Sequence, residues 1–183
     1  MPAAFRVHER PSAEDLRRTI LPLDEMGILE EGDAAALLAG DPFAISRVLE
    51  RARGTSGEYL ASALLLRAQR RATYLPHNEG HYALGASAYC HFTSPIRRYP
   101  DDVVHRALKA HLAGKDGSRE QRAVERVLPQ LCEACSSMER TAYAAARDSQ
   151  KVKMAELYEG RVGQVERGVV SGCERFGAFV SLD

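Results

Sequence analysis

The sequence lacks several features that would place the protein outside the cell or in a membrane. Its 183 residues include only four cysteines, which fit no dense disulfide framework of the kind found in small secreted domains. No apolar run approaches the length of a membrane span, and no basic and apolar leader follows Met1. The composition, 45% hydrophobic and 27% charged, is that of a globular protein. We therefore expect a cytoplasmic protein with no membrane partner.

The chain has no net charge, but its charges are unevenly distributed. Residues 1–66 carry seven arginines against eleven acidic residues, whereas residues 67–111 carry seven basic residues against three acidic ones. Five of the six histidines also lie in the second segment. A basic surface beside a neutral body suits an anionic partner, although an ordinary solvated face would have the same composition.

Capping residues and glycines indicate a mainly helical chain. Ser12 and Asp41 are typical helix N-caps, whereas Gly27, Gly40 and Gly54 are typical helix ends. The predicted helices cover about residues 12–27, 33–40, 41–54, 57–71, 101–113 and 119–157.

Three segments lack the helical pattern. Residues 1–10 are predicted to be irregular, and residues 73–92 to form two short strands joined by turns. Residues 160–183, rich in valine and glycine, are predicted to form two strands with a Gly-rich turn. The expected fold class is therefore α+β and mainly helical.

The most unusual segment is HFTSPIRRYPDDVVHR, residues 91–106. Pro95 and Pro100 fix their own φ angles and restrict the residues before them, so the loop should be rigid. Arginine is suited to bidentate phosphate contacts, and Arg97 and Arg98 would lose little freedom on binding. Alternatively, the arginine pair bridges buried carboxylates in a helix-capping loop. The composition alone leaves both interpretations open.

A metal site is the less favoured interpretation of the acidic and histidine residues around this loop. Asp101 and His105 lie four residues apart on one predicted helix face. No compact histidine pair with a supporting ligand set is present, and no second pair completes a zinc site with Cys132 and Cys135. We predict that Asp101 caps the helix, that His105 packs, and that the chain itself holds no metal.

The segment HFTSPIRRYPDDVVHR resembles the signature of the ribonuclease II / ribonuclease R family, in its catalytic RNB domain. RVHERPSAEDLRRTILPLDEMG and LLLRAQRRATYLPHNEGHYALGASAYCHF resemble the stretches before the signature, and CSSMERTAYAAARDSQ resembles the helix after it. GRVGQVERGVVSGCERFGAFVSLD resembles the first strands of a C-terminal OB-fold RNA-binding barrel. The resemblance implies that residues 1–157 are the C-terminal part of an RNB domain and that residues 158–183 begin an OB-fold domain.

The resemblance also implies an activity: 3'→5' hydrolysis of single-stranded RNA to nucleoside monophosphates. In this family, aspartates hold two Mg²⁺ ions that activate water and stabilise the leaving oxygen. The resemblance gives Arg97 the catalytic role of neutralising charge on the scissile phosphate. It assigns RNA contacts to seven further residues: Thr93, Ser94, Arg98, His81, Tyr82, Glu139 and Arg147.

The sequence departs from the family pattern at three points. Ala146 stands where many relatives have glutamate, Asp102 stands where they have an apolar residue, and the spaced aspartate cluster is not present. We therefore expect a fragment that is inactive alone, or one half of a split enzyme whose partner, a missing N-terminal half, supplies the aspartates. The other interpretations are a non-catalytic RNA-binding remnant and a helical interaction domain.

Overall fold

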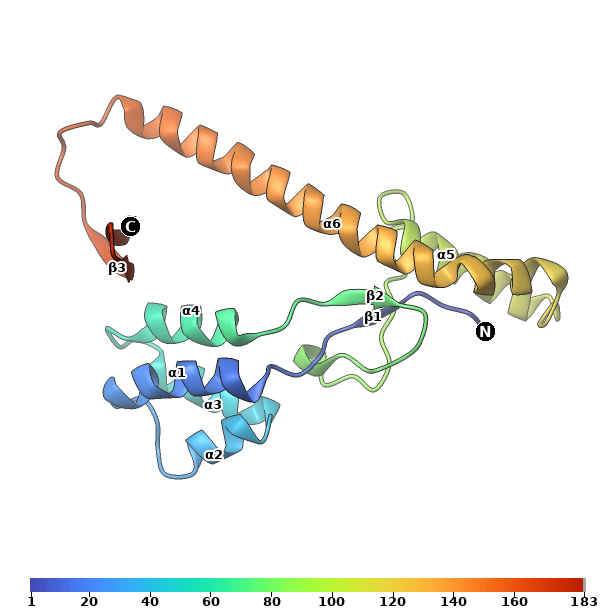
Figure 1. Ribbon diagram of the computed structural model, residues 1–183, viewed down its shortest axis with the longest axis horizontal. Helices are drawn as coiled ribbons and strands as arrows, with labels where there is room; N and C mark the ends of the chain where they lie inside the picture. The colour runs from blue at the N-terminus through green and yellow to red at the C-terminus, as the bar shows by residue number, and fades with distance from the viewer. Residues whose placement is uncertain (183) are drawn as a thin grey trace. The chain divides into compact units, whose positions relative to one another are not determined.

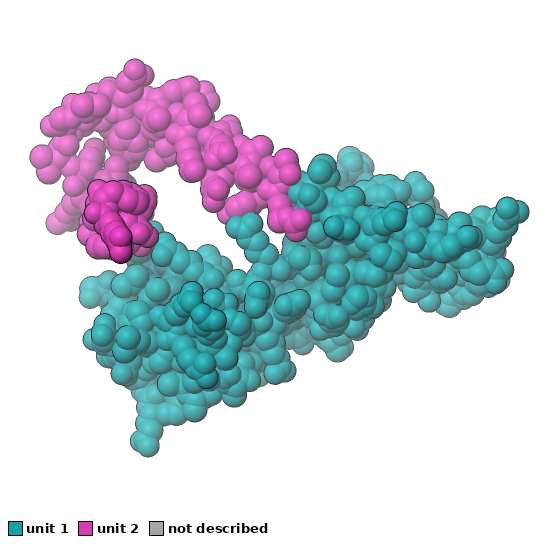
Figure 2. All heavy atoms as spheres, viewed as in Figure 1, with its two compact units in different colours: residues 1–138 teal, residues 139–183 magenta. Residues whose placement is uncertain are grey.

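Helices dominate the computed structural model, which describes residues 1–182 (Figure 1). Its helices are α1 (Ala13–Glu25), α2 (Asp33–Leu38), α3 (Pro42–Ala52), α4 (Glu58–Ala68), η1 (Tyr82–Leu84), α5 (Tyr99–Leu112) and α6 (Arg119–Glu159). Its strands are β1 (Phe5–Val7), β2 (Thr73–Leu75), β3 (Gly168–Glu174) and β4 (Gly177–Leu182). The predicted α+β, mainly helical class is confirmed. The chain divides into two compact units, residues 1–138 and 139–183 (Figure 2).

The first helices begin and end where their local sequence signals predict. The side chains of Ser12 and Asp41 accept hydrogen bonds from backbone N–H groups in the first turns of α1 and α3. Gly27 and Gly40 follow α1 and α2 with φ angles of 67° and 73°, a left-handed conformation that favours glycine. Local chemistry is therefore sufficient to set these boundaries.

The inward faces of α1 to α4 form one apolar core. In this part of the first unit, α1 packs on α2 and α4, and α3 packs on α2 and α4. The buried members are Leu23, Ile28, Leu37, Ala44, Val48, Ala52, Ala61 and Leu65. Leu23 is 0% exposed whereas Leu21, two residues earlier on α1, is 63% exposed, as expected for a helix with one apolar face.

A second core lies where the small β1–β2 sheet meets α5 and the first part of α6. The two strands pair antiparallel, with Phe5 opposite Leu75. The buried members are Ala4, Tyr74, Val103, Leu128 and Cys132. Burial and the neighbouring Cys135 raise the pKa of the Cys132 thiol to about 11, so this side chain is packed and uncharged at neutral pH.

The structure corrects the predicted strands of the first unit. Residues 1–10, predicted to be irregular, contain β1, which is the partner of β2. Residues 73–92 supply one strand instead of two, and the rest of that segment forms η1 and single bridges. Extended structure is interrupted there because Gly80 and Gly85 have φ angles of 77° and 60°.

The start of α5 also differs from the prediction. The helix begins at Tyr99 instead of Asp101, so Pro100 and Asp101 both lie in its first turn. Proline is tolerated there because the backbone N–H groups of the first turn have no partner within the helix. Asp101 is therefore a residue of the first turn and not the N-cap, which is Arg98.

In the second unit, the remainder of α6 is followed by the β3–β4 hairpin. The strands pair antiparallel, with Gly168 opposite Leu182 and an irregularity between Val170 and Gly172. The two predicted strands are thus present, while their assignment to an OB fold and the domain boundary at residues 157–158 stay predictions. Among the described helices, none has a stretch long and apolar enough to cross a bilayer.

We expect Leu23→Ala to destabilise the α1–α4 core by about 3 kcal/mol, because it leaves a cavity between close-packed helices. Urea unfolding followed by far-UV circular dichroism measures this loss. Leu21→Ala removes the same atoms from the exposed face of α1 and should change the free energy of unfolding by less than about 0.5 kcal/mol. Equal losses in the two variants would contradict the assigned core.

Candidate nucleic-acid interface

The segment from Thr93 to Arg98 forms a turn immediately before α5. The Ser94 carbonyl accepts hydrogen bonds from the N–H groups of Arg97 (3.2 Å) and Arg98 (3.0 Å). The Ser94 N–H in turn donates to Oδ2 of Asp101 at 2.8 Å. A side chain from the first turn of α5 therefore closes the turn.

The Asp101 carboxylate is fully buried beneath this turn. Its Oδ2 also accepts a hydrogen bond from Nη2 of Arg98 at 2.9 Å. Burial acts to raise the pKa of this carboxyl, but the hydrogen bonds from Ser94 and Arg98 and the charge of Arg98 outweigh burial and hold the pKa below its ordinary value. The N-terminal turn of a helix also favours negative charge. Asp101 is therefore ionised at neutral pH.

The two adjacent arginines have different environments. The side chain of Arg98 is 22% exposed and forms an ion pair with Asp101, as the helix-capping alternative predicts. The side chain of Arg97 is exposed, and it makes no hydrogen bond or ion pair with any residue that the structure describes. Thr93 and Ile96 beside it are also exposed. The turn thus presents to the solvent one guanidinium that is available for a charge-assisted contact with phosphate.

A chain of hydrogen bonds ties the start of this loop to α6. Nδ1 of His91 and the Tyr74 hydroxyl lie 2.9 Å apart. The Tyr74 N–H donates to Oγ of Ser136, and the Ser136 hydroxyl donates to the Cys132 carbonyl, both at 2.9 Å. Sequence reasoning considered His91 only as one of the histidines of the less favoured metal site. It gave Ser136 no part in the site, because Tyr74 and Ser136 are 62 residues apart and meet only in the fold.

His81 and Tyr82 belong to a cluster of rings at η1. The His81 ring stacks on that of His8 with centroids 5.1 Å apart, and the Tyr82 ring lies 6.3 Å from His8 at an interplanar angle of 11°. Tyr89 packs edge-on against both His81 (5.3 Å) and His91 (5.7 Å). His8 was not predicted as a site residue; its only signal was a histidine within RVHERP, in a segment expected to be irregular.

Glu139 and Arg147 lie elsewhere in the chain. Both are exposed on the part of α6 that belongs to the second unit. The structure brings Thr93, Ser94, Arg97 and Arg98 together on one turn. Glu139 and Arg147 belong to the other unit. Their assignment as RNA contacts stays a prediction.

The carboxylates near the loop do not form a magnesium site. Within residues 1–182, no three His, Cys, Asp or Glu side chains come together in a way that could hold a metal ion. Oδ2 of Asp101 accepts both of its hydrogen bonds and Oδ1 is buried, and Asp102 forms an ion pair with Arg106 at 2.8 Å. His105 packs as predicted, since its ring stacks on Phe92 at 4.1 Å. The acidic residues of α5 therefore stabilise the loop and the helix.

Comparison with known families identifies the fold to which this turn belongs. The family model for the RNB domain matches residues 1–114, more than half of the chain. The chain belongs to the RNB domain family. The resemblance to the ribonuclease II / ribonuclease R family is thereby confirmed. The protein named Ribonuclease R 1 from Lactococcus lactis is 37% identical over 183 residues, which cover 100% of this chain and 22% of that protein.

Two solved structures of Mycoplasma genitalium RNase R share the fold. The apo form is 26% identical with a TM-score of 0.88, and the match covers 99% of this chain and 28% of that one. The form in complex with ribose methylated single-stranded RNA is 25% identical with a TM-score of 0.84 and the same coverage. The chain thus spans about a quarter of the length of the relatives that it matches.

We expect Asp101→Asn to destabilise the protein by about 3 kcal/mol at pH 7, because Arg98 would lose its buried counter-charge. The pKa of Asp101 is lower in the folded than in the unfolded protein. Its stabilising contribution is therefore present above the unfolded-state pKa of about 3.9 and is lost as the pH falls through the folded-state pKa. Urea unfolding from pH 7 downward measures the difference between the variant and the wild type.

Asp102→Asn is the matched control for this change. The side chain of Asp102 is 32% exposed and its partner Arg106 is 68% exposed, so the loss should stay below about 1 kcal/mol. A difference between Asp101→Asn and the wild type that stays constant down to the acid range would contradict the role given to the ionised carboxylate.

Proposed function

We propose that this chain is part of a 3'→5' exoribonuclease that acts on single-stranded RNA, and that Arg97 contacts the scissile phosphate. The observation that carries the proposal is the exposed, unpaired guanidinium of Arg97 on a turn closed by Asp101. Membership of the RNB family supports RNA as the substrate, and the similar M. genitalium protein was solved with single-stranded RNA.

Arg97 would act by stabilising charge on the phosphate. As a nucleophile adds to phosphorus, negative charge builds up on the non-bridging oxygens, and a fixed guanidinium can donate two hydrogen bonds to them. The backbone of Arg97 is already held through the Ser94 carbonyl. Less conformational entropy is therefore lost on binding than for a guanidinium on a mobile loop.

The proposal includes the remaining predicted RNA contacts. In the proposal, Thr93 and Ser94 offer hydroxyl groups to phosphate or ribose, and Arg98 contributes mainly by keeping the turn closed. His81, Tyr82, Glu139 and Arg147 are further RNA contacts. The proposed domains are residues 1–157, within an RNB domain, and residues 158–183, at the start of an OB fold.

The proposal assigns the metal chemistry to other residues. Two Mg²⁺ ions supply the activated water and stabilise the leaving oxygen in this type of reaction. Since the residues described here form no such site, the ligands would be aspartates of another segment or of a partner polypeptide in the cytoplasm. Alone, residues 1–183 would bind RNA without hydrolysing it. A purely RNA-binding role is the second candidate, favoured by Ala146 in place of the family's glutamate.

We expect Arg97→Ala to weaken binding of single-stranded RNA about tenfold and to reduce the slope of log affinity against log salt by about one, because one phosphate contact is lost. Fluorescence anisotropy of a labelled oligonucleotide at several salt concentrations measures both quantities. Arg17→Ala removes the same charge from the exposed face of α1 and should change neither. Equal effects of the two substitutions would contradict the assignment of Arg97.

Hydrolysis is tested separately with a 5'-labelled single-stranded RNA, with Mg²⁺ and then with EDTA. We expect no shortening by this chain alone, because its described residues form no metal site. A ladder that shortens from the 3' end, and is lost with EDTA, would show that the chain supplies its own metal ligands. Shortening that requires an added polypeptide carrying the aspartate cluster would distinguish the split-enzyme interpretation from the RNA-binding remnant.

A further inference from the structure

We infer that a pocket at the ring cluster of His8, His81 and Tyr82 binds an RNA base. The inference rests on the proposed function, since the base would belong to the same kind of RNA. The pocket has a volume of about 460 Å³, within the range of about 300–1,000 Å³ typical of sites for small organic groups. Gly80 and Gly85 form part of its wall, so no side chain occupies that space.

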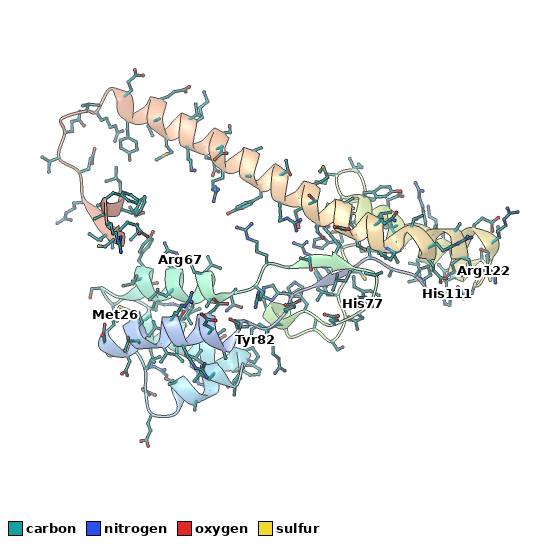
Figure 3. All side chains as sticks on the ribbon, in the orientation of Figure 1. Met26, Arg67, His77, Tyr82, His111 and Arg122 are labelled. Carbon is teal, nitrogen blue, oxygen red and sulfur yellow. The ribbon has the colours of Figure 1, made fainter. Side chains whose placement is uncertain are left out.

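The rings of the pocket are oriented for stacking. The His8 and His81 rings are 25° from parallel, and the His8 and Tyr82 rings are 11° from parallel. Tyr82 lies where η1 meets the chain between β1 and α1, and its N–H donates to the His8 carbonyl at 2.9 Å (Figure 3). Aromatic and imidazole faces are the surfaces on which proteins stack unpaired bases. The geometry therefore suits a flat aromatic ligand.

The charges of the lining favour the uncharged base over the phosphate. Burial lowers the pKa values of both His8 and His81, so both imidazoles are neutral at pH 7. Arg10 is the one cationic side chain in the lining, and two acidic side chains, Glu9 and Glu79, accompany it. A pocket with this balance offers no concentrated positive charge to a phosphate group.

The same three residues also carry polar atoms without partners. Nδ1 of His8, Nδ1 of His81 and the Tyr82 hydroxyl are buried and make no hydrogen bond within the described part of the chain. His8 is only 9% exposed. Unpaired buried polar atoms are uncommon in folded proteins and call for a partner. Because these atoms are closed to solvent in the unliganded pocket, a base edge can pair with them only if the rings reorient as the base binds.

The ring cluster is also connected to the Arg97 turn. Tyr89 contacts His81 on one side and His91 on the other, and His91 lies two residues before Thr93. Stacked and edge-on rings thus continue from the pocket to the start of the loop. One single strand of RNA can therefore place a phosphate at Arg97 and another of its nucleotides at the pocket.

The first test uses the unaltered chain and follows the imidazole signals of His8 and His81 by nuclear magnetic resonance. Three probes are compared: a short adenine oligonucleotide, adenosine monophosphate, and ribose 5-phosphate, which has no base. We expect the two base-containing probes to shift both signals and ribose 5-phosphate to leave them unchanged. Shifts with the oligonucleotide alone would show that the bound base belongs to an RNA strand. Shifts with the mononucleotide alone would show that the pocket binds a free nucleotide. Equal shifts with ribose 5-phosphate would overturn the inference.

The second test measures oligonucleotide affinity by fluorescence anisotropy. Tyr82→Ala should weaken binding about tenfold, because one base loses its stacking surface. Tyr82→Phe keeps the ring and should lose less affinity. It replaces the alanine variant in this test if circular dichroism shows that the alanine variant is unfolded. Tyr59→Ala, on an exposed position of α4, and His111→Ala, at the far end of α5 from Tyr82, should bind as the wild type does (Figure 3).

The outcomes separate this inference from the proposed function. If Arg97→Ala weakens RNA binding but Tyr82→Ala does not and the histidine signals stay still, the pocket is not a base site and the proposed function stands. If the wild-type chain binds neither the oligonucleotide nor the mononucleotide, both are overturned. If the mononucleotide shifts the histidine signals while RNA binding is independent of Arg97, the pocket is a nucleotide site and the proposed function fails.

Discussion

A single buried carboxylate organises the basic loop of this protein. Asp101 accepts hydrogen bonds from the backbone before it and from the arginine side chain next to the helix, and both reach the same oxygen. A buried carboxylate without such partners would be strongly destabilising, so the loop and the helix start must form together. The exposed position of Arg97 is consistent with this, because the neighbouring Arg98 already neutralises the buried Asp101.

The different environments of Arg97 and Arg98 bear on the two interpretations that the sequence left open. The motif predicted either a phosphate-binding pair or a pair that bridges buried acids. The second interpretation describes Arg98, and the first stays a proposal for Arg97. The sequence could not decide between them, because adjacent residues in a turn point in different directions only once the turn closes. That closure depends on Asp101, which the helical pattern alone placed at the wrong position of the helix.

Features that depend on residues close together in the sequence could be predicted, whereas those that depend on distant residues could not. Helix starts at Ser12 and Asp41 and helix ends at Gly27 and Gly40 depend on atoms a few residues away, and they were predicted correctly. The pairing of β1 with β2 joins residues about seventy positions apart, and no local pattern signals it. The ring cluster has the same origin, since His8 meets His81 only when that sheet has formed.

The hydrogen bond between β2 and Ser136 has a consequence for how α6 can vary. Leu128 and Cys132 face the same core as Tyr74, and the Ser136 hydroxyl must also reach the strand. These positions are four residues apart, so they lie along one side of the helix. Inserting or deleting one residue among them would rotate everything beyond it by about 100° around the helix axis. Changes of chain length in α6 are therefore far less tolerable here than changes of side-chain identity on its exposed side.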